Sequence, residues 1–145
     1  MGLIDRLGPG PVGLDTAIFI YWIEESPRFM PQLEPLFAAI DRGLIAAVTS
    51  QLTLLETLVV PLRENDLLLA ERYEAILGAS RGLSLLPIDL EVLRAAARIR
   101  AATAARTPDA IQLATALAAG CTAFVTGDRR VPSLPRLPVV SLSGP

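Results

Sequence analysis

Two acidic residues bracket a helix and a strand in the last third of the chain, and they carry the strongest chemical signal in the sequence. Asp109 falls in the first turn of a helix that Thr107 can cap. The apolar residues 123–125 then predict a short buried strand, and Asp128 follows just past its end. In open α/β sheets, ligands bind at the edge where parallel strands end and helices begin. The spacing therefore brings two carboxylates to one ligand-binding edge.

Two further acids lie where carboxylates are unusual. Asp15 follows a predicted short strand over residues 12–14, and Glu56 lies amid apolar neighbours in a predicted helix over residues 51–60. An ionised carboxylate buried there without a partner would cost several kcal/mol, so Glu56 either points into a cleft or pairs with a cation. The other eleven of the fifteen acids fall in polar turns, helix caps and exposed helix faces, where they are ordinary surface charge.

The composition limits what these four acids can do. The chain has no His, and its thirteen basic residues are all Arg, which excludes Ser-His-Asp and Cys-His nucleophile systems and imidazole metal ligands. Four carboxylates close together would repel one another, whereas Mg²⁺ or Mn²⁺ would bind them favourably. Metal ions held in this way activate water and stabilise a leaving oxygen, which is sufficient to cleave a phosphodiester without His or Lys.

Arginines are the groups available to hold an anionic substrate. The candidates are Arg100, Arg106, Arg129 and Arg130. The formal net charge is −2, but if four carboxylates bind metal, the thirteen arginines face eleven acids, a balance of 13 − 11 = +2. That balance permits a nucleic-acid partner.

Helical and strand patterns alternate along the chain. A hydrophobic fraction of 52% with only 5% aromatic residues is typical of buried parallel strands covered by helices. We therefore expect a single domain over residues 1–145, an α/β three-layer sandwich with a short parallel five-stranded sheet, after a loose Gly/Pro-rich lead-in at residues 1–11. The expected strands are 12–14, 44–48, 83–88, 123–125 and 139–142. The expected helices are 17–25, 31–42, 51–60 closed by Pro61, 66–78, 89–100 and 107–120.

The sequence gives no sign of a membrane segment. Its longest apolar runs are broken by Arg, Gly or Pro well before the roughly 18 residues that a spanning helix needs, and the N-terminus lacks a basic region followed by a hydrophobic block. We expect a soluble, cytoplasmic protein. The single cysteine, Cys121, lies in an apolar approach to a strand and is expected to be a small buried hydrophobic residue.

Four segments of the chain, taken together, resemble segments of a known protein family. They are LDTAIFIYW, TSQLTLLETLVVPLR, RTPDAIQLATALAAGCTAFVTGDRRV and LPVVSL. In this order and spacing they resemble the PIN-domain nucleases, and most closely the toxin ribonucleases of the bacterial VapC type. The resemblance extends from Val12 to Leu142, and its most specific part is the block from PDA to TGD. One departure is Val131, where relatives frequently carry an aromatic or larger apolar residue.

This resemblance implies both a site and an activity. It assigns metal binding to Asp15, Glu56, Asp109 and Asp128, and a place beside them to the small polar residues Thr16 and Thr126. It implies a Mg²⁺- or Mn²⁺-dependent endoribonuclease that acts as the toxin of a toxin-antitoxin pair. The implied partners are an RNA substrate, a second copy of the chain in a homodimer, and an antitoxin that inserts a segment into the acidic cleft.

Two other functions can be weighed from the residues. A phosphatase or receiver domain with an aspartate nucleophile normally uses a Lys, which this chain lacks, and Ala17 stands where that phosphatase class carries its second Asp. The stronger alternative is a catalytically inactive PIN-like module that binds protein or RNA, although such a module has no physical need for four repelling carboxylates. Cleavage of DNA also stays open, because metal chemistry at a phosphodiester does not itself require a 2′-hydroxyl.

Overall fold

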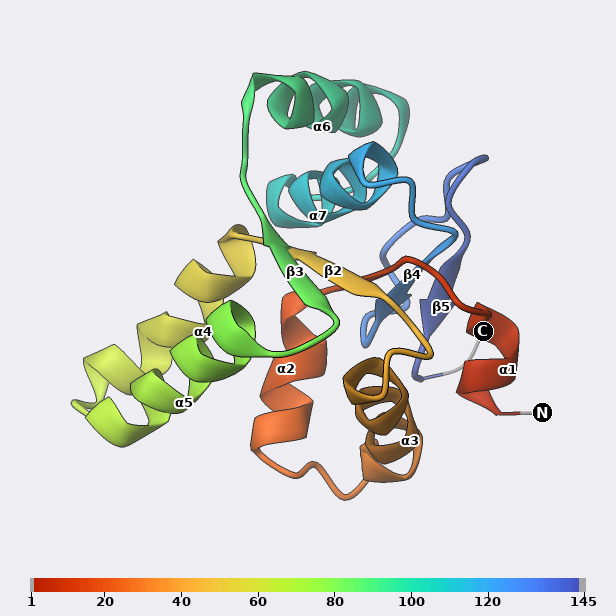
Figure 1. Cartoon of the computed structure of the whole chain (residues 1–145). Helices are drawn as coiled ribbons and strands as arrows, with labels where there is room; N and C mark the ends of the chain where they lie inside the picture. Colours follow the sequence, from red (N-terminus) through yellow and green to blue (C-terminus); the bar gives the residue numbers. More distant parts are fainter. Residues whose placement is uncertain (1, 144–145) are drawn as a thin grey trace.

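The structure is a computed structural model that describes residues 2–143, so the ends of the expected domain, residues 1 and 144–145, lie outside it. Its sheet has five strands, all parallel, in the spatial order β3-β2-β1-β4-β5 (Figure 1). The strands are β1 (Val12–Leu14), β2 (Ala47–Ser50), β3 (Leu83–Leu86), β4 (Ala123–Thr126) and β5 (Val139–Ser141). The predicted α/β class and parallel five-stranded sheet are confirmed.

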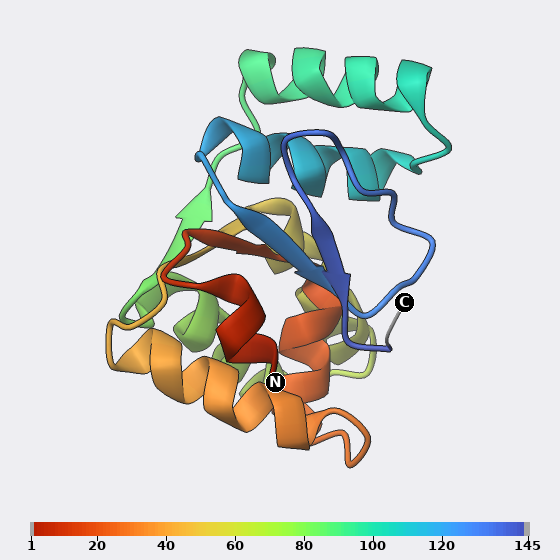
Figure 2. The same ribbon diagram turned by 90° about the vertical axis from the view of Figure 1, so that its right-hand side faces the viewer.

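Helices cover both faces of this sheet. They are α1 (Leu3–Leu7), α2 (Thr16–Ile23), α3 (Met30–Asp41), α4 (Leu52–Arg63), α5 (Leu67–Ala79), α6 (Leu90–Ala102) and α7 (Thr107–Ala118). α6 and α7 lie on one face, while α2, α3 and α5 lie on the other, with α4 packed along α5 (Figures 1 and 2). The three layers predicted from the alternation of strands and helices are therefore present.

Two buried clusters, one on each side of the sheet, hold the layers together. Val125 belongs to the cluster that contains Phe19 of α2 and Leu36 of α3. The preceding residue, Phe124, belongs instead to the cluster that contains Leu113 of α7. Successive side chains of a strand point to opposite faces of a sheet, so all four residues of β4 are buried because both of its faces are covered, and the first three of them are apolar.

α7 packs unusually close to the sheet because β1 has a glycine at its centre. A Cβ atom added at Gly13 would lie 2.7 Å from Cδ1 of Phe124 and 2.9 Å from Cβ of Ala116 in α7. No side chain fits in that space. Since Asp109 lies in the first turn of α7, Gly13 helps to set how deeply this acid sits at the edge of the sheet.

The second strand differs from the predicted residues 44–48. Leu44 is 59% exposed in the turn after α3, and β2 begins only at Ala47. The strand then continues through Thr49 and Ser50, which are both buried. The Thr49 hydroxyl donates a hydrogen bond to the Leu14 carbonyl at 2.8 Å, so this polar residue is satisfied inside the core. A search for apolar runs could not find a strand that ends in buried polar residues.

Three other local predictions are wrong. The lead-in at residues 1–11, expected to be loose, contains α1, whose two leucines are buried. α4 continues two residues past Pro61, because the missing N–H of proline does not prevent the next residues from keeping a helical backbone. Arg106, not Thr107, stands at the N-cap position of α7, where its side chain makes no capping hydrogen bond, and Thr107 is already helical.

The remaining sequence expectations concern membranes and the cysteine. No helix within the described residues is long and apolar enough to cross a membrane. Cys121 is buried as predicted, and this burial raises the pKa of its thiol to about 11.

Candidate active site at the carboxyl edge of the sheet

All four predicted acids line one pocket. The strand order reverses between β1 and β4, which is the point where open α/β sheets form ligand sites. Asp15 directly follows β1, Asp128 lies two residues past β4, Glu56 belongs to α4, and Asp109 belongs to the first turn of α7. The pocket has a volume of about 360 Å³ and is called the acidic pocket below. Its walls also include Thr16, Arg106 and Gln112.

Asp15 is buried, with only 8% of its surface exposed. The Thr126 hydroxyl donates a hydrogen bond to Oδ2 of Asp15 and accepts one from the backbone N–H of Asp128 at 3.0 Å. Oδ1 of Asp15 is buried and has no hydrogen-bond partner among residues 2–143. Burial raises the pKa of Asp15 to about 6, although the Thr126 hydrogen bond opposes this rise. An unpaired carboxylate oxygen in a pocket wall is suited to a cation.

Glu56 is held at the pocket by a chain of polar side chains from four elements, α2, β2, α4 and α7. Thr16 Oγ1 donates a hydrogen bond to Glu56 Oε1 at 2.6 Å. Gln112 Nε2 donates to Thr53 Oγ1 at 2.8 Å. The Thr49 hydroxyl gives its proton to a backbone carbonyl, so Thr53 must be the donor in the 2.7 Å contact between these two hydroxyls. The carboxylate therefore points into the pocket and away from the apolar core.

Sequence reasoning missed Gln112 and Thr53. Gln112 is 3% exposed, and its Oε1 also accepts a hydrogen bond from the backbone N–H of Ser50 at 3.3 Å. A signal was available, because Gln112 is the one amide in α7, has apolar neighbours on both sides, and lies three residues after Asp109 on the same helix face. Thr53 carries no comparable signal in the sequence.

Gln112→Leu is expected to lower the free energy of unfolding by about 1 to 3 kcal/mol, because it leaves buried donors and acceptors without partners. The measurement is urea unfolding of the wild type and the variant at one pH. Gln51→Leu makes the same chemical change at an exposed position and should alter stability by less than about 0.5 kcal/mol. Equal stability of the two variants would show that the buried hydrogen bonds of Gln112 contribute nothing to the free energy of unfolding.

Asp109 and Asp128 have arginine partners in this structure. Arg106 contacts both acids, with its Nε 3.2 Å from Asp109 Oδ2 and its Nη2 3.5 Å from Asp128 Oδ2. Arg130 Nη2 lies 2.9 Å from Asp128 Oδ2, and the Arg130 backbone N–H donates to Oδ1 at 2.8 Å. These Arg130 hydrogen bonds hold the pKa of Asp128 below its ordinary value. Both arginine side chains are mostly exposed, so a stronger ligand can replace them.

Of the four arginines predicted to bind substrate, Arg106 lines the acidic pocket and Arg130 reaches it only through its contact with Asp128, whereas the other two lie elsewhere. Arg100 donates to the Ala105 carbonyl at 3.2 Å and to Thr107 Oγ1 at 3.0 Å, which fixes the turn between α6 and α7. Arg129 donates from Nη2 to the Ser143 carbonyl at 2.7 Å and lines a neighbouring hollow.

The same residues match a known family. A family model described as the PIN domain matches residues 12–137, which include all four acids. The chain belongs to the PIN-domain family. No curated protein matches this PIN domain in sequence.

Several solved structures have a similar fold, including a toxin-antitoxin complex and VapBC2. A toxin-antitoxin complex from Klebsiella pneumoniae matches with a TM-score of 0.68 and 21% identity, over 90% of this PIN domain and 97% of that chain. VapBC2 from Rickettsia felis, bound to a DNA fragment from their promoter, matches with a TM-score of 0.62 and 15% identity over the same shares. At these identities the likeness establishes the fold.

PIN domains are generally nucleases and typically use a divalent metal ion. The donor set of the acidic pocket fits such an ion by its chemistry, since it offers carboxylate oxygens and one buried oxygen without a partner. As the side chains stand, no three Asp, Glu, His or Cys residues within the described part of the chain lie close enough together to hold a metal. Asp109 is instead paired with Arg106, and Asp128 with Arg130, so a metal ion must compete with these ion pairs.

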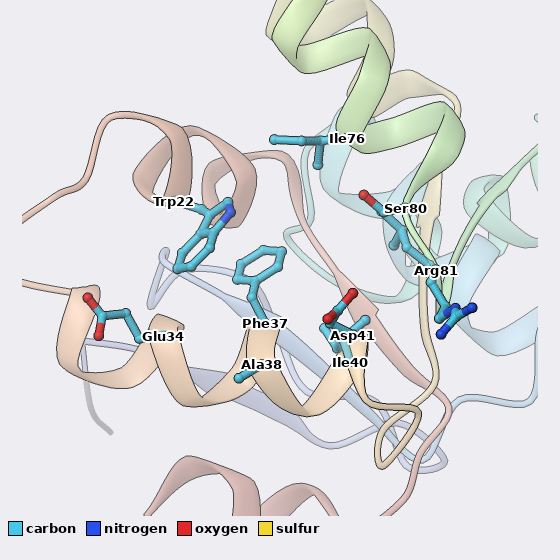
Figure 3. A pocket seen from close by; sticks show the side chains of 10 residues that line it. Trp22, Glu34, Phe37, Ala38, Ile40, Asp41, Ile76, Ser80 and Arg81 are labelled. Atoms are coloured by element: carbon cyan, nitrogen blue, oxygen red, sulfur yellow. The ribbon is translucent and has the colours of Figure 1, made fainter.

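A separate cavity of about 350 Å³ lies between α2, α3 and α5 (Figure 3). Its aromatic wall is Trp22, which stacks on Phe37 with ring centroids 4.5 Å apart. Its charged lining residues are Glu34, Asp41 and Arg81. None of the predicted site residues lines this cavity, so the acidic pocket is the candidate active site of this PIN domain.

Proposed function

We propose that this PIN domain is a Mg²⁺- or Mn²⁺-dependent endoribonuclease of the cytoplasm and the toxin of a toxin-antitoxin pair. The observation that supports this most is the acidic pocket, where Asp15 presents a buried, unpaired oxygen beside three further carboxylates. A hydrolase that relies on a histidine base is excluded, because the chain contains no His. Carboxylates and a hard cation are the remaining means of activating water.

The residues of the pocket have separate roles in this proposal. Asp15, Glu56, Asp109 and Asp128 would hold the cation. Bound there, the ion supplies a water of lowered pKa and positive charge for the leaving oxygen. Thr126 and Thr16 hold Asp15 and Glu56 in place through their hydroxyl groups. Arg106 can exchange its carboxylate partners for the phosphate of the substrate, because guanidinium groups bind both anions with the same geometry.

The proposed regulatory partner is an antitoxin that places a segment in the acidic pocket. The similar solved structures include a toxin-antitoxin complex and VapBC2, which motivates this part of the proposal. The pocket accepts positive groups readily, since two arginines of the chain already pair with its acids. A basic side chain of a partner would satisfy the unpaired Asp15 oxygen in the same way.

We also propose that the protein forms a homodimer. Leu55, Val59 and Leu62 lie on one face of α4 and are 60%, 39% and 55% exposed. An apolar helix face of this kind is stabilised when a second copy covers it. Sedimentation of the purified protein measures the assembly directly.

The test of the proposed activity is cleavage of a structured RNA pool by the purified protein with Mg²⁺, with Mn²⁺ and with EDTA, in parallel with Asp109→Asn. We expect cutting that depends on the metal and is lost in the variant, because this substitution removes a ligand charge from the pocket. Glu71→Gln removes one charge from the exposed face of α5 and should cut at the wild-type rate.

Each other outcome has a definite meaning. Cleavage at the wild-type rate by Asp109→Asn contradicts the metal-site assignment. Metal binding without cleavage of any RNA contradicts the nuclease activity as stated, and loss of metal binding as well supports the inactive binding module instead. A parallel assay with single-stranded DNA measures whether the activity is confined to RNA.

A further inference from the structure

A hollow adjoins the acidic pocket on the side of α2 and the segment after β4. It has a volume of about 510 Å³ and shares two wall residues, Ala17 and Asp128, with the acidic pocket. Its other walls include Tyr21, Arg28, Gly127 and Arg129. Because the two hollows share these wall residues, an extended polymer can run from the acidic pocket into this flanking hollow along the protein surface.

The flanking hollow differs from the acidic pocket in its charge. Arg28 has its guanidinium carbon 4.9 Å from the centre of the Phe29 ring and forms no ion pair with any residue between 2 and 143. Arg129 bonds to a neutral backbone carbonyl. The acid in the wall, Asp128, is already paired with Arg130. Two positive charges therefore face this hollow without a carboxylate partner among residues 2–143, whereas Arg106 and Arg130 both have one.

The hollow also has an aromatic wall. The Tyr21 ring stacks on Phe29 with centroids 4.5 Å apart, which fixes its plane. A Cβ atom added at Gly127 would lie 2.6 Å from Cε2 of Tyr21, so the glycine lets the ring lie directly against the segment that leads to Asp128. Tyr21 therefore gives the hollow an aromatic wall beside the segment that leads to Asp128.

We propose that the flanking hollow binds the single-stranded RNA segment next to the scissile phosphate, with Arg28 and Arg129 on its phosphates and Tyr21 against a base. A single strand alternates anionic phosphates with flat bases, and a groove of positive charges beside an aromatic ring matches that alternation. The assignment rests on the proposed nuclease function, since it extends the substrate of the same pocket.

A third hollow offers the competing path. It has a volume of about 450 Å³ and contains Arg6 and Arg129. It shares only Asp128 with the acidic pocket, and no aromatic residue is among its walls. The flanking hollow is therefore the better continuation of the acidic pocket, and Arg6 serves as a nearby control.

The experiment measures fluorescence anisotropy of a short fluorescein-labelled single-stranded RNA in EDTA over a series of salt concentrations. Each phosphate contact with a single strand contributes about 0.7 to the slope of log K against log salt. The slope is negative, and Arg28→Gln and Arg129→Gln are each expected to make it shallower by about 0.7. Arg6→Gln and the distant Arg63→Gln should keep the wild-type slope. Tyr21→Leu is expected to weaken binding about tenfold without changing the slope.

Binding in EDTA separates this proposal from the nuclease activity. Wild-type slopes for both Arg28→Gln and Arg129→Gln overturn the assignment, and so does a shallower slope for Arg6→Gln with an unchanged slope for Arg28→Gln. Failure of the wild type to bind the RNA overturns it as well. RNA that binds with the expected slopes but stays uncut with Mg²⁺ and Mn²⁺ supports the hollow and contradicts only the nuclease function. RNA that is cut by a protein whose variants keep the wild-type slope contradicts only the hollow.

Discussion

Asp15→Asn is expected to abolish RNA cleavage and at the same time to stabilise the metal-free protein. Cleavage should fall more than about 100-fold, because even the partners of metal ligands are worth 10- to 100-fold in affinity or activity. Stability should rise because the carboxylate is buried with one oxygen unpaired, and a neutral amide costs less to bury than a charge. A residue kept only for folding would not show these opposite effects.

The pH dependence of this stabilisation has a definite sign. The folded-state pKa of Asp15 is about 6 against an ordinary value of 3.8, so the folded protein binds the proton more tightly than the unfolded chain. The ionised carboxylate therefore destabilises the fold increasingly as the pH rises from about 4 to about 6, by about 3 kcal/mol in total. We expect the variant to gain about 1 to 3 kcal/mol over the wild type at pH 8 and little at pH 4.

Urea unfolding in EDTA at the two pH values measures this difference. Asp66→Asn is the matched control, because Asp66 is an exposed cap of α5 and asparagine caps helices as well as aspartate does. Addition of Mg²⁺ should then raise the Tm of the wild type more than that of Asp15→Asn, since only the wild type keeps the full ligand set. A variant that is less stable than the wild type at pH 8 would refute the argument from burial.

Gly13→Ala is expected to destabilise the protein by about 1 to 3 kcal/mol, although it adds a single methyl group. The new Cβ would lie under 3.0 Å from both Phe124 and Ala116. The Cβ atom of Ala116 cannot move unless the backbone of α7 moves with it. The helix must therefore move away from the sheet, and the Phe124 ring must turn. Because α7 carries Asp109 and Gln112, the cleavage rate should fall together with stability.

Gly78→Ala provides the contrasting case for this prediction. Gly78 lies within α5, and a Cβ added there meets no atom within 4 Å. Alanine at such a position is expected to raise stability by about 0.4 to 1 kcal/mol through helix propensity and a less flexible unfolded chain. Thermal unfolding of both variants under one condition tests the pair. A Gly13→Ala protein as stable as the wild type would show that the contact between α7 and β1 is not tight.

Local patterns in the sequence were sufficient for β4, because its residues 123–125 are all apolar. β4 is buried on both faces, and its run of apolar residues between two glycines predicts it correctly. β2 was placed three residues too early, because its last residues, Thr49 and Ser50, are polar and become buried only when β1, β3 and α7 supply hydrogen-bond partners. Polarity predicts exposure unless a partner is known, and the partner is a property of the fold.

The sequence by itself determined the family, the parallel sheet and the position of four acids at its carboxyl edge, because strand ends and helix starts are local signals and a parallel sheet gathers them at one edge. Only the tertiary structure decided which groups these acids meet. Arg106 reaches Asp128 across 22 residues of sequence, and Gln112 reaches Thr53 across 59. Such contacts depend on how α7 packs against β1 and α4, which no local pattern records. The same packing paired Arg106 and Arg130 with carboxylates and gave Arg28 and Arg129 none within the described part of the chain.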